Sequence, residues 1–282
     1  MKKILVPTDF STQAEIAIDL AMQLANKMGA SIKLVHVYEY PMATAYTTLD
    51  IGGPDPIESD YAREMMDHSR SQLDEQASII AEKGVQVEQE LKMGNPFVNL
   101  SEELKDENVD LVVMGSKGTA GIEGSIIGSN TEKVVRHAKC PVIAVKEPLT
   151  LDSIKTIVFA SNFKEVDARL TIALKELQAM FDATLQFVRI NTLNNFEPDS
   201  YSMRRMKRWV RENKFQEFTL RIYNDLEEED GIIHYAEESN ADMLAMGTHG
   251  RTGLGHLFGG SLAEDVVNNS KRPIWTFHIG SN

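Results

Sequence analysis

Cysteine is almost absent from this sequence of 282 residues, in which Cys140 is the only one. A single thiol can form neither an intramolecular disulfide nor a thiolate metal cluster, and such scarcity is typical of proteins in a reducing cytoplasm. Long uncharged apolar runs are also missing, since no stretch approaches the roughly 18 residues that a membrane span requires. The apolar stretch after Lys3 is too short for a signal peptide. We therefore expect a soluble cytoplasmic protein with no membrane partner.

Basic residues are scarce too. The chain has 29 Lys and Arg against 42 Asp and Glu, which gives a formal net charge of −13. An acidic chain is repelled by nucleic acid and by anionic membranes, so we expect neither as a partner. One basic stretch, residues 204–211, is interpreted as a solvated helix face, with contact to a phosphate or a partner as the alternative.

The sequence consists of two copies of one unit. Residues 4–10 align with residues 157–163 at an offset of 153, and residues 110–115 align with residues 242–247 at an offset of 132. The first copy therefore holds 21 additional residues, which we place within residues 40–60, where proline and glycine interrupt any periodic pattern. This period is far too long for a solenoid, so we predict two tandem domains, residues 1–148 and 151–282.

Short apolar runs alternate with helical patterns in each copy. Continuous apolar runs are typical of buried parallel strands, and helical spacing recurs within residues 17–28 and 65–80. Five strands alternating with four helices indicate an α/β, Rossmann-like unit, with an open parallel sheet and helices on both faces. The strands of the first copy are expected at residues 4–6, 32–37, 85–91, 111–114 and 142–145.

A glycine-rich loop follows the fourth predicted strand of each copy. Glycine permits positive φ and lets the backbone approach a ligand closely, and a serine with glutamate three residues later is a capping box that opens a helix. Free N–H groups at a helix N-terminus bind anions, so we predict a phosphate site. The alternative is a plain turn and helix cap, and the repetition at identical spacing argues against it. The loop residues are Gly115, Gly118, Gly128 and Ser129 in the first copy and Gly247, Gly250, Gly260 and Ser261 in the second.

A second polar segment lies at the end of the first strand of each copy. It reads Pro7-Thr8-Asp9 in copy one and Ala160-Ser161-Asn162 in copy two. Ligands of open α/β sheets bind outside the carboxyl ends of the strands, where the strand order reverses. We therefore expect this segment and the glycine loop to share one site.

The spacing Gly-x2-Gly-x9-Gly-Ser resembles the nucleotide-binding fingerprint of the universal stress protein family, and the resemblance covers the whole chain as two tandem domains. It implies an adenine nucleotide alpha hydrolase-like fold that binds ATP, with Mg²⁺ as an optional companion. Carried over to this sequence, the family pattern places Asp9 and Val37 on the nucleoside and the glycine loop on the ribose and phosphates. The binding residues implied are Pro7, Thr8, Asp9, Val37, Gly115, Gly118, Gly128, Ser129 and Asn130, and, in copy two, Asn162, Ile190, Gly247, Gly250, Gly260, Ser261 and Leu262.

Copy two departs from this pattern at the end of its first strand. Asn162 keeps hydrogen-bonding ability but lacks the charge of Asp9, so the second site is the less certain of the two. In the family the closing strands pair edge to edge. We therefore expect residues 142–145 and 274–277 to pair within one chain, which makes a pseudo-dimer and covers two exposed edges. Further pairing into a homodimer and an unidentified protein partner both stay open.

Other residues suggest no separate chemistry. The chain has no P-loop, no serine with an evident base, and no histidine pair at metal-binding spacing, so we expect neither catalytic nor metal-ligating residues. His36 is interpreted as a hydrogen-bonded core histidine and Cys140 as a buried small residue. The acidic residues 227–230 are interpreted as a solvated helix start.

Three functions therefore stand. The first is a non-catalytic ATP-binding protein of the stress response that reports nucleotide or couples it to a partner. The second is an interaction scaffold whose sites are empty or hold another ligand. The third is a slow ATPase, for which Asp9 is the only obvious base.

Overall fold

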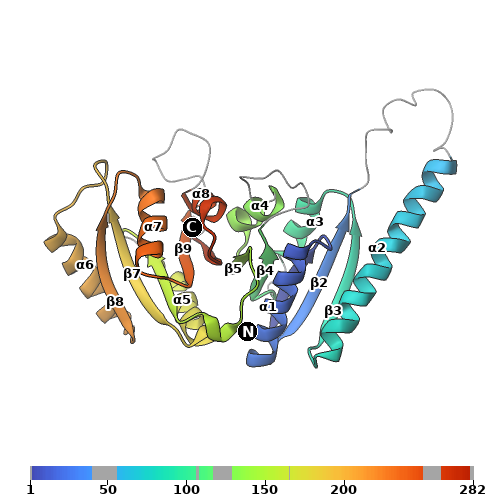
Figure 1. Ribbon diagram of the computed structural model, residues 1–282, viewed down its shortest axis with the longest axis horizontal. Helices are drawn as coiled ribbons and strands as arrows, with labels where there is room; N and C mark the ends of the chain where they lie inside the picture. The colour runs from blue at the N-terminus through green and yellow to red at the C-terminus, as the bar shows by residue number, and fades with distance from the viewer. Residues whose placement is uncertain are drawn as a thin grey trace, which may run out of the picture.

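A computed structural model describes residues 2–39, 56–105, 108–116, 129–164, 166–249 and 262–279 of the chain. Their strands form a single ten-stranded sheet (Figure 1). Within the described residues, no helix has the length and apolar character needed to span a bilayer.

Both copies show the predicted alternation of five strands and four helices. The elements of the first copy are β1 (Lys3–Thr8), α1 (Thr12–Met28), β2 (Ser31–Tyr38), α2 (Pro56–Glu82), β3 (Val87–Met93), α3 (Pro96–Glu103), β4 (Leu111–Gly115), α4 (Ser129–His137) and β5 (Val142–Val145). Those of the second copy are β6 (Thr156–Ala160), α5 (Ala168–Phe181), β7 (Thr184–Asn191), α6 (Asp199–Glu212), β8 (Phe218–Asn224), α7 (Glu228–Glu238), β9 (Met243–His249), α8 (Leu262–Asn269) and β10 (Ile274–Ile279). A 3-10 turn, Leu151–Ser153, connects the two copies.

The strand order is β3-β2-β1-β4-β5-β10-β9-β6-β7-β8. Strands are parallel within each copy, and the two halves meet where β5 pairs antiparallel with β10, with Trp275 opposite Ile143. The pairing expected between the closing strands is thus present. Because it removes one edge from each half, only β3 and β8 remain as edges of the sheet.

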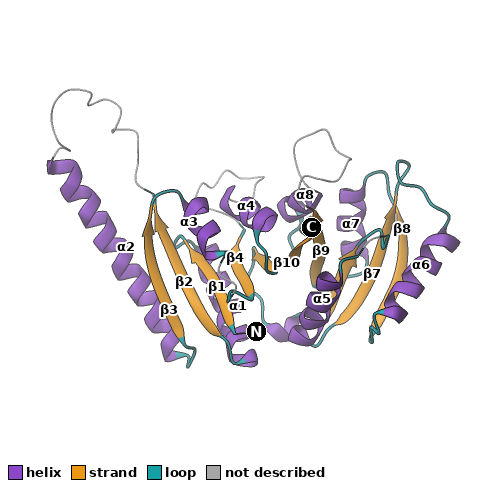
Figure 2. Ribbon diagram, turned by 180° about the vertical axis from the view of Figure 1, so that it is seen from behind, coloured by secondary structure: helices purple, strands orange, loops and turns teal. Residues whose placement is uncertain are grey.

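Helices cover both faces of the sheet (Figure 2). On one face, α1, α2, α5 and α6 pack over one apolar cluster that runs across both copies and includes Leu24, Leu73, Phe159 and Trp275. On the other face, α3 with α4 and α7 with α8 cover two smaller clusters. The shared cluster makes the two copies one packed body.

The prediction that the additional residues of copy one are irregular was wrong for residues 56–60. These residues belong to α2, which begins at Pro56 and has 27 residues against the 14 of its counterpart α6. Proline suits the first turn of a helix, because the N–H that it lacks would have no intrahelical partner there. Part of the insertion therefore lengthens a helix, and residues 40–55 lie outside the described part of the chain.

Candidate functional site

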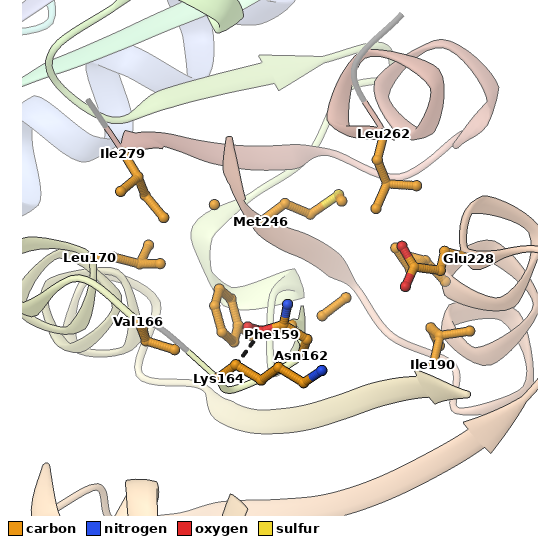
Figure 3. Close-up of a pocket in the computed structure, with 14 residues that line it drawn as sticks. Phe159, Asn162, Lys164, Val166, Leu170, Ile190, Glu228, Met246, Leu262 and Ile279 are labelled. Atoms are coloured by element: carbon orange, nitrogen blue, oxygen red, sulfur yellow. Dashed lines mark hydrogen bonds between the residues drawn. The ribbon is translucent and has the colours of Figure 1, made fainter. Parts of the chain in front are cut away.

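Each copy has a cavity at the carboxyl ends of its strands. The second-copy cavity has a volume of about 460 Å³ and lies between the β6–α5 connection, β7, α7 and β9 (Figure 3). The first-copy cavity measures about 130 Å³. Both lie where the strand order of an open α/β sheet reverses, which is where such sheets bind ligands.

The two cavities are built from equivalent positions of the repeat. Residues of the first two strands and of the turn between them correspond at the offset of 153, and those of the third helix of each copy onward at 132. The corresponding lining residues are Pro7 and Ala160, Thr8 and Ser161, Asp9 and Asn162, Ser11 and Lys164, Val37 and Ile190, Pro96 and Glu228, Leu100 and Ile232, Met114 and Met246, Gly115 and Gly247, and Asn130 and Leu262.

The turn after the first strand has the same hydrogen bonds in both copies. In copy one, the N–H of Phe10 donates to Thr8 Oγ1 at 3.1 Å, and the N–H of Ser11 donates to Asp9 Oδ1 at 3.1 Å. Asp9 Oδ1 also accepts from the Ser11 hydroxyl at 2.5 Å. These contacts fix the polar segment that the sequence singled out.

Copy two repeats this turn with different residues. The N–H of Phe163 donates to Ser161 Oγ at 3.1 Å, and the N–H of Lys164 donates to Asn162 Oδ1 at 2.9 Å. Replacing the aspartate by asparagine therefore keeps the backbone geometry and removes only the charge. The local structure of the second site is intact.

A phenylalanine with positive φ follows each of these polar residues. Phe10 has φ of 61° and Phe163 has φ of 55°, in the left-handed region that side chains with Cβ rarely adopt. Such a residue costs on the order of 1–3 kcal/mol and persists only where its surroundings hold it. The ring of Phe10 lies 4.3 Å from that of His36, and buried Phe163 packs 5.3 Å from Trp209.

His36 lies on the wall of the first cavity and is half-buried. Its Nδ1 donates to the Thr8 carbonyl oxygen at 2.8 Å. Burial lowers the pKa of His36 below its ordinary value, so the ring is neutral near pH 7. The expectation of a hydrogen-bonded histidine is confirmed, although its ring borders the cavity.

One of the two reasons given for glycine at Gly115 and Gly247, a positive φ, was wrong, and the close approach to a ligand stays a prediction. Neither residue has positive φ. At Gly115, a Cβ would lie 2.7 Å from the backbone carbon and oxygen of Gln13, so glycine is needed for β4 to pass close to α1. At Gly247, a Cβ would meet the side-chain ends of Ile279 and Leu170 at 2.9 and 3.0 Å. Packing accounts for both glycines.

The N-terminus of α4 is tied to the end of β4. The Thr131 hydroxyl donates to the Gly115 carbonyl oxygen at 2.9 Å, and Asn130 lines the first cavity beside it. Ser129 is the first residue of α4, as predicted, and the structure describes its backbone only. The order of strand end and helix start needed for an anion site is therefore present.

The structure brings most of the described predicted residues together. Pro7, Thr8, Asp9, Val37, Gly115 and Asn130 line the first cavity, and Asn162, Ile190, Gly247 and Leu262 line the second. The remaining predictions lie outside the described residues: Gly118, Gly128, Gly250, Gly260 and Ser261.

Two charged residues of the second cavity were missed by sequence reasoning. Lys164 follows the strand-end turn, and Glu228 begins α7. The helix start predicted at residues 227–230 is confirmed, since α7 begins at Glu228, and the side chain of Glu228 also borders the cavity (Figure 3). Aligning the two copies at the offset of 132 would have shown that Glu228 is equivalent to Pro96, which follows the Gly94-Asn95 turn at the end of the third strand, and so lies beside the site.

A buried charge network supports the second cavity from the other face of β7. Arg189 is 2% exposed, and its Nη1 donates to Asn191 Oδ1 at 3.0 Å. Arg205 binds Glu197 through both terminal nitrogens and donates from Nε to the Asn162 carbonyl oxygen at 3.0 Å. Hydrogen bonds from Arg205 and Ser202 lower the pKa of Glu197 to about 2. Arg205 thereby ties the network to the strand-end turn.

Comparisons with known proteins agree on one family. The model described as the universal stress protein family matches residues 1–146 and 222–278. The universal stress protein Slr1230 of Synechocystis sp. is 23% identical over 291 residues, covering 98% of this chain and 100% of that protein. The universal stress protein YxiE of Bacillus subtilis is 30% identical over 145 residues, covering 51% of this chain and 98% of the relative.

A solved structure gives the same result for the fold. The crystal structure of a universal stress protein from Archaeoglobus fulgidus superimposes with a TM-score of 0.76 at 21% identity, and the match covers 98% of both chains. At 21% identity, this similarity is evidence for a shared fold alone. It extends over both copies, so the fold of the whole chain has a solved counterpart.

Proposed function

The chain belongs to the universal stress protein family, and on that premise we propose that it binds an adenine nucleotide, ATP, in its two cavities. It then acts in the stress response as a nucleotide-dependent regulator of a protein partner, with the cytoplasm as its place of action. The observation that carries this proposal is the pair of equivalent cavities at the carboxyl ends of the strands.

The second cavity suits a nucleotide in size and chemistry. Its volume of about 460 Å³ falls within the range of roughly 300–1,000 Å³ for small-molecule sites, whereas the described residues of the first cavity enclose only about 130 Å³. Ile190, Ile232 and Met246 offer apolar surface for a base, and Asn162 and Lys164 offer polar groups at the rim. An apolar wall with a few polar groups is the usual composition of a site that binds a planar ring and an anionic tail.

We propose binding without catalysis. The obvious base is Asp9, and its Oδ1 accepts hydrogen bonds from the N–H and hydroxyl of Ser11, so this carboxylate has a structural role in the turn after β1. Any Mg²⁺ would be bound mainly by the phosphates of the nucleotide, because Mg²⁺ sites commonly combine substrate phosphates with only one or two protein carboxylates. Among the described residues, no group of three or more His, Cys, Asp or Glu side chains is arranged to hold a metal ion.

An interaction scaffold is the second candidate, and one observation favours it. Four large apolar side chains of copy two are exposed in or beside the connections that follow β7 and β8. Leu193 is 83% exposed, Phe196 70%, Tyr201 62% and Leu226 72%. Nucleotide that stays bound to the protein through purification would distinguish the nucleotide-dependent regulator from the scaffold, because a pure scaffold binds none.

Cavity filling tests the proposal. Val37→Trp and Ile190→Trp place an indole in the first and second cavity respectively, and Ile172→Trp adds the same ring on the exposed face of α5, where Ile172 is 60% exposed. Isothermal titration of nucleotide-free protein with ATP should show each cavity variant losing one binding event. The Ile172→Trp control should bind as the parent does, and circular dichroism verifies folding. Identical ATP binding in all four proteins would overturn the proposal.

A further inference from the structure

The two cavities carry their carboxylates on different walls. Among the described lining residues of the first cavity, the carboxylate is that of Asp9, at the end of β1. In the second cavity Asn162 holds that position, and the carboxylate is that of Glu228, the first residue of α7. The equivalent first residue of α3 is Pro96, which has no polar side chain. Among the described lining residues, each cavity thus has one carboxylate, placed at a different element.

Glu228 is held in position rather than left in solvent. The side-chain amide of Asn195 donates to Glu228 Oε1. Asn195 is itself fixed, because its Oδ1 accepts from the Thr192 N–H at 2.8 Å and its carbonyl oxygen accepts from Arg189 Nη2 at 2.7 Å. The carboxylate of Glu228 points into the cavity that its side chain borders (Figure 3).

The remaining differences change the electrostatics of the second cavity in a consistent way. Lys164 adds a positive charge where the first cavity has Ser11, and Leu262 replaces the amide of Asn130 at the start of the helix after the glycine loop. The described part of the second cavity therefore places a negatively charged acceptor on α7 and a cation on the β6–α5 connection. A ligand with hydroxyl or amino donors at one end and an anion at the other matches both.

We infer that Glu228 is a specificity-determining residue of the second cavity, whose carboxylate accepts hydrogen bonds from hydroxyl or amino groups of a nucleoside. It takes the place of the missing charge at Asn162, so that the second cavity binds its ligand through a different wall from the first. This inference rests on the proposed function, because it assigns a contact to the same ligand class. It makes the two cavities of one chain chemically distinct sites.

The experiment isolates the second cavity in the Val37→Trp background and introduces Glu228→Gln there. Glutamine has the same shape and can still accept from Asn195, so the fold is retained. Loss of a hydrogen bond to a charged acceptor should weaken both ATP and adenosine by roughly tenfold or more. The matched control is Glu227→Gln, which removes the same charge from an exposed neighbour whose side chain makes no capping bond.

The direction in which Glu228→Gln changes the affinity for ATP distinguishes a direct contact of Glu228 with the ligand from a long-range electrostatic effect of its charge. If Glu228 made no contact with the ligand, removing its negative charge would reduce repulsion of the triphosphate and strengthen ATP binding. Equal or tighter binding of ATP by Glu228→Gln therefore overturns the inference, as does an equal loss in Glu227→Gln. Asp9→Asn, made in the Ile190→Trp background, should weaken the first cavity in the same manner.

The outcome for the Val37→Trp parent distinguishes this inference from the proposed function. If both the unmodified chain and Val37→Trp bind no nucleotide, the proposed function fails and Glu228 loses its ligand with it. If the unmodified chain binds nucleotide and Val37→Trp does not, the second cavity is not a nucleotide site: the inference on Glu228 is overturned, and the proposed function holds for the first cavity alone. Binding by Val37→Trp that Glu228→Gln weakens supports both.

Discussion

A Cβ atom on Gly115 would lie 2.7 Å from the backbone carbonyl carbon and oxygen of Gln13. The end of β4 therefore passes against the first turn of α1 at a distance that only glycine allows. This contact sets the floor of the first cavity, because the turn that precedes α1 and the end of β4 both line it.

The equivalent glycines of the two copies should differ in their tolerance of alanine. Gly115→Ala must displace backbone and should lower the free energy of unfolding by about 1–3 kcal/mol. Gly247→Ala meets only the flexible ends of Leu170 and Ile279, which can turn aside, and should cost less than about 1 kcal/mol. Urea denaturation of both variants measures the difference, and equal losses would show that the close approach to Gln13 is not rigid.

Removing the hydroxyl of Thr276 should increase the stability of the folded protein. Thr276 lies on β10 opposite Val142, is 1% exposed, and its Oγ1 meets no hydrogen-bond partner among the described residues. Thr276→Val replaces an unsatisfied buried polar group by a methyl group and should raise the free energy of unfolding by about 1 kcal/mol. Thr171→Val is the control, since the Thr171 hydroxyl donates to the Asp167 carbonyl oxygen, and it should destabilise. Destabilisation by Thr276→Val would contradict this account of the junction.

Glu197 should contribute to stability in a pH-dependent way. Hydrogen bonds from Arg205 and Ser202 lower the pKa of Glu197 from 4.5 to about 2 in the folded protein. Because the folded value lies below the unfolded one, this stabilisation is complete above about pH 4.5 and is lost as the pH falls toward 2. The stability difference between the parent and Glu197→Gln should therefore shrink as the pH is lowered from 6 to 3. A difference that is constant across this range would refute the assignment.

Cys140 should be unreactive in the folded protein. Burial raises the pKa of its thiol to about 12, so the nucleophilic thiolate is scarce near neutral pH. Iodoacetamide at pH 7.5 should modify Cys140 far more slowly in the native protein than in guanidinium chloride, as mass spectrometry can follow. Equal rates in the two conditions would show that the thiol is accessible.

The fold could be predicted because the sequence repeats. The buried strands are continuous apolar runs, and their recurrence fixed the number and order of elements in each copy. Boundaries were less certain, since the third strand begins at Val87 and the preceding apolar Val85 is buried in the turn before it. Pro56 suggested a loop but begins a helix, because proline is compatible with both.

The candidate site was predicted only in part. Thr8 and Asp9 were found from their place at a strand end, where ligands of such sheets bind, and Val37 from the resemblance to the universal stress protein family. Glu228 was missed because acidic residues at helix N-termini are favoured by the helix dipole, whether or not they border a cavity. The packing role of Gly115 depends on the approach of α1 to β4, a tertiary contact that no local pattern reveals.

The central claim, that both cavities hold an adenine nucleotide, is tested most directly by counting nucleotide. Freshly purified protein is denatured and the released nucleotide is quantified by chromatography, and the remaining capacity is measured by equilibrium dialysis against ATP. The account predicts a total near two nucleotides per chain, one for each cavity. No released nucleotide together with no uptake of ATP would contradict it and would leave the interaction scaffold as the function of this chain.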